Sequence, residues 1–248
     1  MDKILDQIDK ERLPRHVAVI MDGNGRWAQL HGQPRIFGHK NGVRSVRQIT
    51  EASAELGVEF LTLYAFSTEN WSRPADEVDA LMHLLVETVK GELDVLNENS
   101  IRLNAIGDLE NLPPKTYQAL REGIEDTKSN NRMTLTLALN YSSRWELSNA
   151  MRQIAHKVTA GTLGMDQIDD DCISQHLTTA QMPDPELLIR TSGEHRVSNF
   201  LLWQLAYTEF YFTDIFWPEF TKEEFYKAIL DFQLRERRFG QTSDQLKI

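Results

Sequence analysis

The chain of 248 residues has little cysteine and no excess of positive charge, and both shortages restrict its function. Cys172 is the only cysteine, so a disulfide within the chain and a cysteine-rich zinc site are both excluded. The formal net charge is −10 at pH 7, which disfavours binding to nucleic acid, because such binding depends on clustered lysines and arginines. Any affinity for phosphate must therefore come from a local arginine cluster.

Long apolar runs and several catalytic motifs are also missing. The sequence has no apolar run of the roughly 18–20 residues that span a bilayer. Its charged start, MDKILDQIDKERLPRH, lacks the apolar core of a signal peptide. These features predict a cytoplasmic protein. The absence of G-x-S-x-G, H-E-x-x-H and paired C-x-x-C motifs disfavours a serine hydrolase and a zinc peptidase.

Short aliphatic segments alternate with amphipathic ones along most of the chain, which predicts alternating strands and helices. The expected strands are 17–21, 60–66, 101–106, 133–140 and 187–190. The expected helices are 42–56, 75–96, 116–128, 144–158 and 222–238. This order is typical of a single α/β domain with a central, mainly parallel sheet of about six strands flanked by helices.

The expected helices 75–96 and 222–238 carry the clearest local signals. In the first, apolar residues from Val78 to Leu93 recur at three- and four-residue steps and form one stripe. Its first turn contains Asp76 and Glu77, which favour a helix N-terminus. The second ends in three arginines that should complement the negative end of the helix, namely Arg235, Arg237 and Arg238.

Polar clusters directly follow four of the expected strands. Ligands of α/β proteins bind beyond the carboxyl ends of the strands, because the loops that follow parallel strands meet at one edge of the sheet. We therefore expect one site to contain the segments 22–27, 67–73, 140–144 and 190–196.

The segment 22–27, DGNGRW, carries the strongest functional signal. Gly23 and Gly25 permit backbone angles and a close approach of ligand that side chains prevent. Arg26 can bind phosphate oxygens, and Asp22 suits such a site if a divalent cation lies between its carboxylate and the anion. Because D-G and N-G are also common turn dipeptides, an ordinary turn is the alternative.

Five arginines fall in or near these loops of an otherwise acidic chain: Arg26, Arg35, Arg73, Arg190 and Arg196. This is more positive charge than one monophosphate needs, so one or two diphosphates are favoured. A surface ion pair would explain any one of these arginines alone. His39 is able to donate a hydrogen bond to a phosphate or to transfer a proton, although it also suits the start of a helix.

Aromatic residues are frequent near the same edge. Trp27 and Trp71 suit an apolar slot or the stabilisation of a carbocation, although core packing explains either one singly. The run 203–212 is unusually aromatic, which fits an oligomer interface and a buried edge strand about equally well. Glu209 within this run needs a metal ion or an arginine as its partner.

Five ordered motifs together resemble the cis-prenyltransferase family over about residues 15–240: HVAVIMDGNGRWA, FGHKNG, LTLYAFSTENWSRP, IRTSGEHRVSNFLLWQ and FWP. The resemblance implies sequential condensation of isopentenyl diphosphate onto farnesyl diphosphate with Mg²⁺. The implied product is undecaprenyl diphosphate, the lipid carrier precursor for cell-wall and peptidoglycan synthesis. A homodimer, an apolar product tunnel and transient association with the inner face of the membrane are also implied. The domain would be preceded by a helical segment, 1–14, and followed by a tail, 241–248.

The resemblance implies a role for each matching residue. Asp22 would bind magnesium, with Glu209 contributing near the subunit boundary, and would assist departure of the allylic diphosphate. Asn70 occupies the position assigned as proton acceptor, although a diphosphate oxygen or a water molecule is chemically a better acceptor. The remaining matches would bind the diphosphates or surround the reacting groups: Gly23, Asn24, Gly25, Arg26, Trp27, Arg35, His39, Ser67, Thr68, Glu69, Trp71, Arg73, Arg190, Arg196, Val197 and Ser198.

Two alternatives stay open, namely an enzyme that stops at a shorter product and a non-catalytic partner subunit. Met133 matches a position where bulky residues limit product length in the family. The chain departs from the family pattern where Ser142 and Ser143 replace a glycine pair and where Ser192 replaces a glycine. We expect little loss from Ser192 and a stiffer turn from the serine pair.

Overall fold

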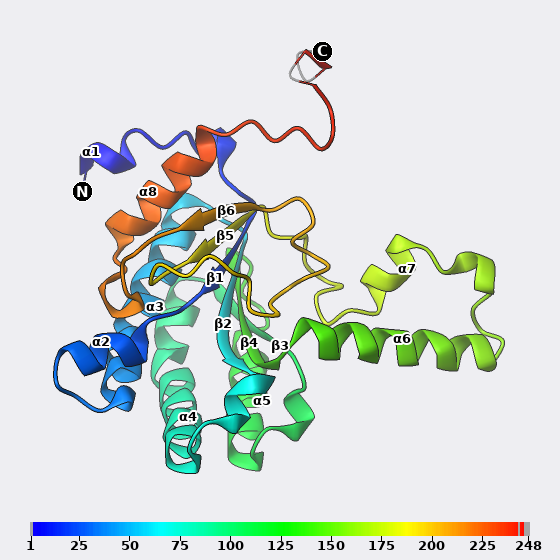
Figure 1. Ribbon diagram of the computed structural model, residues 1–248, viewed down its shortest axis with the longest axis horizontal. Helices are drawn as coiled ribbons and strands as arrows, with labels where there is room; N and C mark the ends of the chain where they lie inside the picture. Colours follow the sequence, from blue (N-terminus) through cyan, green and yellow to red (C-terminus); the bar gives the residue numbers. More distant parts are fainter. Residues whose placement is uncertain (1, 243, 246–248) are drawn as a thin grey trace.

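The computed structural model describes residues 2–242 and 244–245 (Figure 1). Within them, six strands form one sheet in the order β3–β4–β2–β1–β5–β6, and all neighbouring strands are parallel. This confirms the prediction of a parallel sheet of about six strands flanked by helices. The strands are β1 His16–Ile20, β2 Phe60–Ser67, β3 Ile101–Ile106, β4 Met133–Tyr141, β5 Leu187–Arg190 and β6 Glu209–Phe212.

The helices follow the predicted order, with two unpredicted short helices at Asn24–Leu30 and Asp170–Gln175. They are α1 Asp2–Leu5, α2 Asn24–Leu30, α3 Arg35–Leu56, α4 Ala75–Glu98, α5 Pro114–Thr127, α6 Ser143–Thr159, α7 Asp170–Gln175 and α8 Lys222–Gln233. Helix α3 begins seven residues before the predicted start at 42. Its first two turns carry no clear apolar stripe, but Pro34 directly precedes them and suits a helix start.

Helix α8 ends at Gln233, five residues before the predicted end. The prediction that Arg235, Arg237 and Arg238 complement the end of this helix is therefore wrong. Arg235 lies 3.0 Å from a carboxylate oxygen of Glu209, and Arg237 pairs with Glu186. These arginines join the segment after α8 to the edge of the sheet.

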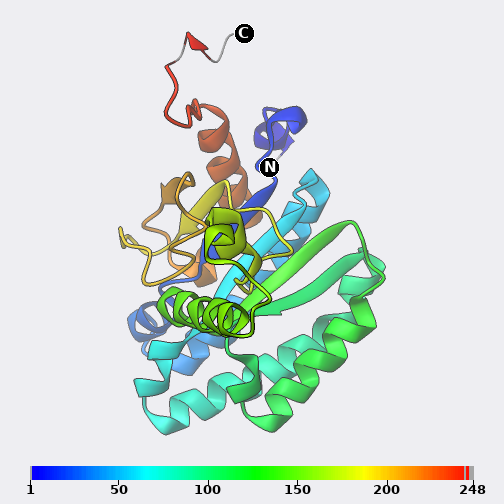
Figure 2. The ribbon, with the colours of Figure 1, turned by 90° about the vertical axis from the view of Figure 1, so that its right-hand side faces the viewer.

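The two faces of the sheet are covered differently. Helices α3, α4, α5 and α8 pack on one face and bury alternate strand residues such as Val19 and Leu63. Figure 2 shows α4 and α5, in cyan to green, along this face. The loop between β5 and β6 covers the other face, where Phe200 and Leu201 pack on Ile20. Helices α6 and α7 extend away from the sheet as an arm (Figure 1).

The N-terminal segment packs on α8, where the Nη2 of Arg12 donates a hydrogen bond to the carbonyl of Gln233 at 2.8 Å. The expected tail 241–248 lies partly outside the described residues. No helix in the described part of the chain is long and apolar enough to cross a membrane.

A bulge in β2 sets which way the end of this strand faces. Tyr64 pairs with Ala138 of β4 and Phe66 pairs with Leu139, so Ala65 is an extra residue without its own partner. Side chains alternate along a strand, and one extra residue reverses the alternation. Phe66 consequently packs in the same core as Leu63, while Tyr64 packs on the other face.

Candidate active site

A cavity of about 660 Å³ begins at the carboxyl end of the sheet and continues between the sheet and helices α3 and α4. Its outer end is polar and includes Asp22, His39, Arg73 and Arg190. Its deeper wall is mostly apolar, with Leu81, Met82, Leu85 and Val89 from α4 and Ile101, Leu103 and Leu135 from the sheet. The expected apolar tunnel is confirmed, and α4 forms one of its walls.

Asp22 follows β1 and lies at the centre of the polar end. Its carboxylate accepts hydrogen bonds from the Nη2 of Arg190 at 2.8 Å and from the N–H of Gly23 at 2.7 Å. The Nη2 of Arg26 lies 3.3 Å away. Burial alone would raise the pKa of Asp22, but Arg190, Arg26 and Gly23 together lower it below its usual value. The carboxylate is therefore ionised at neutral pH.

Arg190 ends β5 and is almost fully buried, with 3% of its surface exposed. Its Nη1 donates to the Oγ of Ser198 at 2.7 Å and to the carbonyl of Arg196. Ser198 has a φ of 48°, which side-chain-bearing residues rarely adopt. Such backbone strain clusters at functional sites, because the surrounding structure must hold it in place.

Arg26 and Arg196 share one carboxylate at the mouth of the cavity. The Oε1 of Glu194 lies 2.9 Å from the Nη1 of Arg26, and its Oε2 lies 2.5 Å from the Nη1 of Arg196. The hydrogen bond from Arg196 is the main reason that the pKa of Glu194 is lowered. Together with Arg190, the two arginines form what we call the first cationic group: Arg26, Arg190 and Arg196, with Ser198 beside Arg190.

A second cationic group consists of Arg35 and Arg73, with the neutral His39 beside them. The carboxylate of Glu77 lies 3.2 Å from the Nε of Arg35 and 3.1 Å from the Nη1 of Arg73, so one acid bridges two arginines. Gly25 makes room for this arrangement, because a Cβ at Gly25 would lie 2.6 Å from the Cζ of Arg35.

His39 is half-buried beside this group. Burial first, and then the charge of Arg73, lower its pKa to about 4, so its imidazole is neutral at pH 7. Its Nε2 has no hydrogen-bond partner among the described residues. The histidine is therefore placed to exchange a hydrogen bond with a ligand rather than to supply a fixed charge.

We expect the stability of the protein to fall as pH decreases from about 6.5 to about 4. Burial also lowers the pKa of His16 to about 4, whereas an unfolded histidine titrates near 6.5. Because the unfolded chain binds these protons first, its free energy falls relative to that of the folded chain over this range, by at most roughly 3 kcal/mol per histidine.

Urea unfolding across this pH range measures the effect. The His16→Gln variant should have a shallower pH dependence than the wild type, while the exposed control His83→Gln should keep the wild-type dependence. Equal pH dependence in all three proteins would show that buried neutral histidines do not contribute.

The segment after β2 forms the 3₁₀ turn η2, Thr68–Ser72, over the cavity. The Oδ1 of Asn70 accepts a hydrogen bond from the N–H of Ser67 at 3.1 Å, so Asn70 is held as a local cap. Glu69 accepts a hydrogen bond from the Nδ2 of Asn199 at 2.8 Å. This contact joins η2 to the loop that carries Ser198.

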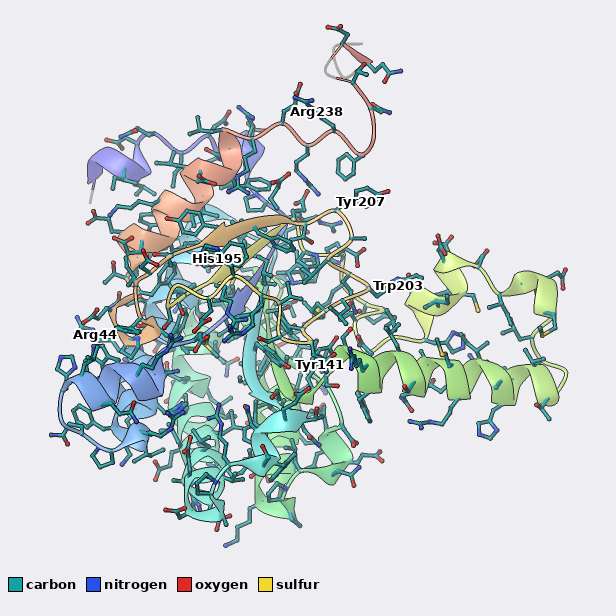
Figure 3. The ribbon with its side chains drawn as sticks, viewed as in Figure 1. Arg44, Tyr141, His195, Trp203, Tyr207 and Arg238 are labelled. Atoms are coloured by element: carbon teal, nitrogen blue, oxygen red, sulfur yellow. The ribbon has the colours of Figure 1, made fainter. Side chains whose placement is uncertain are left out.

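The serine pair 142–143 has a clear structural role. The Oγ of Ser142 accepts a hydrogen bond from the N–H of Trp145 and caps α6, and the Oγ of Ser143 accepts one from the N–H of Leu202 at 2.8 Å. Tyr141 lies where β4 leads into α6 (Figure 3), and its hydroxyl donates to the buried Glu146 at 2.6 Å. The serine pair therefore ties α6 to the loop after β5, as expected for a stiffer turn.

A family model described as putative undecaprenyl diphosphate synthase matches residues 20–240 of the chain. The chain belongs to this family.

Individual relatives match most of the chain. An isoprenyl transferase of Chlorobaculum tepidum is 53% identical over 235 residues, which cover 95% of this chain and 89% of the relative. The ditrans,polycis-undecaprenyl-diphosphate synthase ((2E,6E)-farnesyl-diphosphate specific) of Vibrio cholerae is 48% identical, with 97% and 96% covered. The structure of lavandulyl diphosphate synthase from Lavandula x intermedia in complex with dimethylallyl diphosphate has a TM-score of 0.91 and 37% identity. That match covers 93% of this chain and all of the other.

The structure brings most of the sequence-predicted site residues together. Nine of them line the cavity: Asp22, Asn24, His39, Ser67, Glu69, Asn70, Arg73, Arg190 and Ser198. Others lie beside these at the mouth: Gly23, Gly25, Arg26, Arg35 and Arg196.

Other sequence-predicted residues lie outside the cavity wall. The ring of Trp27 stacks on Phe37, and its Nε1 donates to Glu219 at 2.9 Å. Trp71 donates to the Oδ1 of Asn140, Thr68 contacts Glu69, and Val197 packs in the core behind the sheet. For these four residues, the structure supports a role in packing or in positioning neighbours.

Met133 is fully buried and is not part of the cavity wall. It pairs in register with Ile101, and Ile101, Leu103 and Leu135 form the inner end of the cavity instead. An effect of Met133 on product length would therefore have to act through the neighbouring residues that line the cavity.

Glu209 does not reach Asp22 within one chain. Both Val17 of β1 and Glu209 of β6 lie level with Leu187 of β5, at the amino end of the sheet. Asp22 follows Val17 by five residues, which places it roughly 16 Å further along the strand direction. Glu209 instead pairs with Arg235 at 3.0 Å. A metal site shared by Asp22 and Glu209 of the same chain is therefore excluded.

Three site residues were missed at the sequence level, namely Glu77, Asn199 and Tyr64. In the sequence, Glu77 was explained as an acid in the first turn of a helix, so its contact with two arginines was not predicted. Asn199 follows Ser198 and has a φ of 60°, a hint that sequence alone does not provide. Tyr64 lines part of the cavity, and its hydroxyl donates to the carbonyl of Tyr141 at 3.2 Å.

The polar end of the cavity has unmet hydrogen-bonding capacity. Asn24 Oδ1, His39 Nε2 and Arg190 Nε are buried and have no partner among the described residues. Buried polar atoms usually have a partner, so this convergence indicates a polar ligand. The described residues include no group of three or more metal-binding side chains. Mg²⁺ needs only one or two carboxylates when substrate phosphates complete its coordination, and Asp22 fits that requirement.

Proposed function

We propose that the chain condenses isopentenyl diphosphate with farnesyl diphosphate repeatedly to give undecaprenyl diphosphate, a precursor of the lipid carrier for cell-wall synthesis. One observation carries the proposal: two cationic groups lie at the mouth of a long apolar cavity. A prenyl diphosphate has the same division between a multiply charged head and an apolar chain. Family membership and the Vibrio cholerae relative support the same reaction class.

The two cationic groups would hold two different diphosphates. Arg35, His39 and Arg73 lie beside the α3–α4 entrance to the apolar wall and suit the allylic substrate. Arg190, Arg196 and Ser198 suit isopentenyl diphosphate. In this structure, the arginines of both groups form ion pairs with the carboxylates of Glu77, Glu194 and Asp22. Each diphosphate would therefore replace a carboxylate as the partner of these arginines.

In the reaction, the allylic C–O bond breaks and the allylic carbon gains positive charge. The double bond of isopentenyl diphosphate supplies the electron pair of the new C–C bond, and the resulting cation loses a proton to restore a double bond. Arginines around the leaving diphosphate stabilise its growing charge. Mg²⁺, held by Asp22 and the diphosphates, would add further charge stabilisation. Asn70, a neutral amide, would orient a water molecule or diphosphate oxygen that accepts the proton.

We also propose a homodimer in the cytoplasm, with transient contact with the inner face of the membrane during product release. The edge strand β6 is only half-buried, and Tyr207 beside it is 67% exposed, which suits an interface (Figure 3). Glu209 would join a metal site only from a second subunit.

Two alternative functions were left open by the sequence. Asp22 and the arginines argue against a non-catalytic partner subunit. An enzyme that stops at a shorter product is tested directly by product sizing.

The deciding experiment is incubation with farnesyl diphosphate, labelled isopentenyl diphosphate and Mg²⁺, followed by product sizing. We expect labelled prenyl diphosphates that lengthen with time, and EDTA should stop their formation. Absence of any labelled prenyl product would overturn the proposed reaction. A full rate in EDTA would overturn the metal requirement alone.

A further inference from the structure

The cavity is too small for the whole of the proposed product. A cavity of about 150 Å³ is known to take up one benzene molecule, which corresponds to roughly 25 Å³ per carbon atom. On that scale the 660 Å³ found here hold about 26 carbon atoms. This is ample for a farnesyl group but less than half of an undecaprenyl chain. The far end of a long product must therefore leave the cavity while its diphosphate end is still bound.

The strand residues at the inner end of the cavity are buried in the core. Ile101, Leu103 and Leu135 lie there on the sheet and are 1%, 2% and 5% exposed. Leu103 pairs with Leu135 across β3 and β4, Ile101 pairs with the buried Met133, and α4 and α5 cover these strands. An exit at this end would require the central core to separate.

The seam between α3 and α4 is the weaker wall. The two helices lie side by side (Figure 1), and the cavity runs between them. Val43 and Val46 of α3 and Leu84 and Leu85 of α4 line the cavity and are only half-buried. An apolar chain that passed between them would cover this exposed apolar surface.

An ion pair spans the seam. The Nε and Nη2 of Arg47 lie 3.0 Å and 2.5 Å from the two carboxylate oxygens of Glu92, which makes the contact two-pronged. Both residues line the cavity, yet the side chain of Arg47 is 51% exposed, so the cavity reaches solvent here. Among the described residues, Arg47, Glu51 and Glu92 are the charged members of the wall away from the polar end, and Glu51 pairs with Lys222 at 3.0 Å.

We propose that the α3–α4 seam is a side exit for the growing prenyl chain and that the Arg47–Glu92 ion pair is its latch. The inference rests on the proposed function. The Arg47 half of this pair is exposed, and an ion pair that water reaches contributes little to stability, so this pair opens more easily than a packed core. The first additions take place with the latch closed, and later ones push the chain end between the helices. Product length then depends on how freely the seam opens.

The test joins the two helices reversibly in the full-length chain. In the Arg47→Cys/Glu92→Cys variant, a disulfide-forming cross-linker of suitable span connects the two cysteines, and reductant releases it. We expect products of the linked enzyme to stop at roughly five isoprene units, the length that fills the cavity. Addition of reductant should restore the length distribution of the unlinked variant. Each single-cysteine variant, treated in the same way, controls for modification alone and for the native Cys172, which is buried.

A second variant, Val46→Trp, places a large side chain in the seam without a cross-link. Like the cross-linked enzyme, it should make shorter products than the wild type. Full-length product from both the linked enzyme and Val46→Trp would overturn the side exit. If the products of the wild type stop at about five isoprene units, the prenyl chain never outgrows the cavity and the side exit is also overturned. The proposed prenyl transfer would still hold in that case. No condensation by the wild type would instead reject the proposed function.

Discussion

Replacing Asp22 by alanine will reduce kcat by at least about 10³-fold and leave the fold intact, because the Asp22 carboxylate lines the cavity beside the first cationic group, where it would hold a metal ion. The side chain is 27% exposed, so its loss leaves no buried gap. Arg190 keeps its contacts with Ser198 and the carbonyl of Arg196.

The effect of Asp22→Ala should separate kcat from KM. The Asp22 carboxylate forms ion pairs with Arg190 and Arg26, so its removal makes both arginines available to a diphosphate. We therefore expect KM for isopentenyl diphosphate to stay the same or to fall while kcat collapses. Steady-state kinetics measure both values, and Asp126→Ala, an exposed substitution on α5, is the matched control. A kcat close to that of the wild type would reject the role of Asp22.

Changing Arg190 to lysine should lower kcat/KM by about 10²-fold, and changing it to methionine by more than about 10³-fold. The guanidinium holds Asp22 through Nη2 and Ser198 through Nη1 at once, at 2.8 Å and 2.7 Å. The single ammonium group of lysine is able to replace one of these contacts but not the forked arrangement. Loss of the second contact also releases the strained loop that carries Ser198.

Kinetics with varied isopentenyl diphosphate test this prediction, and thermal unfolding shows whether each variant is folded. Arg196→Lys is the matched control, because the Arg196 side chain is 60% exposed and a mobile ammonium group there should cost much less. If Arg190→Lys kept activity within twofold of the wild type, the forked contact would be unnecessary.

The sheet and the position of the site were predictable because their signals are local. Aliphatic runs mark the buried strands, and the rule that ligands bind at the carboxyl edge of a parallel sheet is enough to bring Asp22, Arg73 and Arg190 together. Trp27 shows where this reasoning ends. Helix α2 begins at Asn24, and side chains on a helix turn by about 100° per residue, so Arg26 and Trp27 diverge although they are adjacent in the sequence.

Relations between distant segments were not predictable from residue patterns. Glu209 lies in the aromatic run next to other candidate residues, but the parallel register carries it to the opposite end of the sheet from Asp22. The extra residue Ala65 turns Phe66 toward the cavity. The sequence does not reveal this bulge, because Tyr64 and Phe66 on either side of Ala65 are both aromatic and show no change between polar and apolar residues. Pairing of Glu77 with two arginines likewise depends on how α3 and α4 approach each other.

The carboxylates paired with the arginines at the mouth of the cavity affect the rate at which a diphosphate substrate reaches the site. Asp22, Glu69, Glu77 and Glu194 nearly cancel the five arginines at the mouth, so little net field extends beyond the Debye length of about 10 Å at 0.1 M salt. Diffusing diphosphates are then not drawn in from afar, and capture depends on contact with the guanidinium forks. Encounter rates should accordingly vary only weakly with ionic strength, in contrast to sites that display uncompensated positive charge.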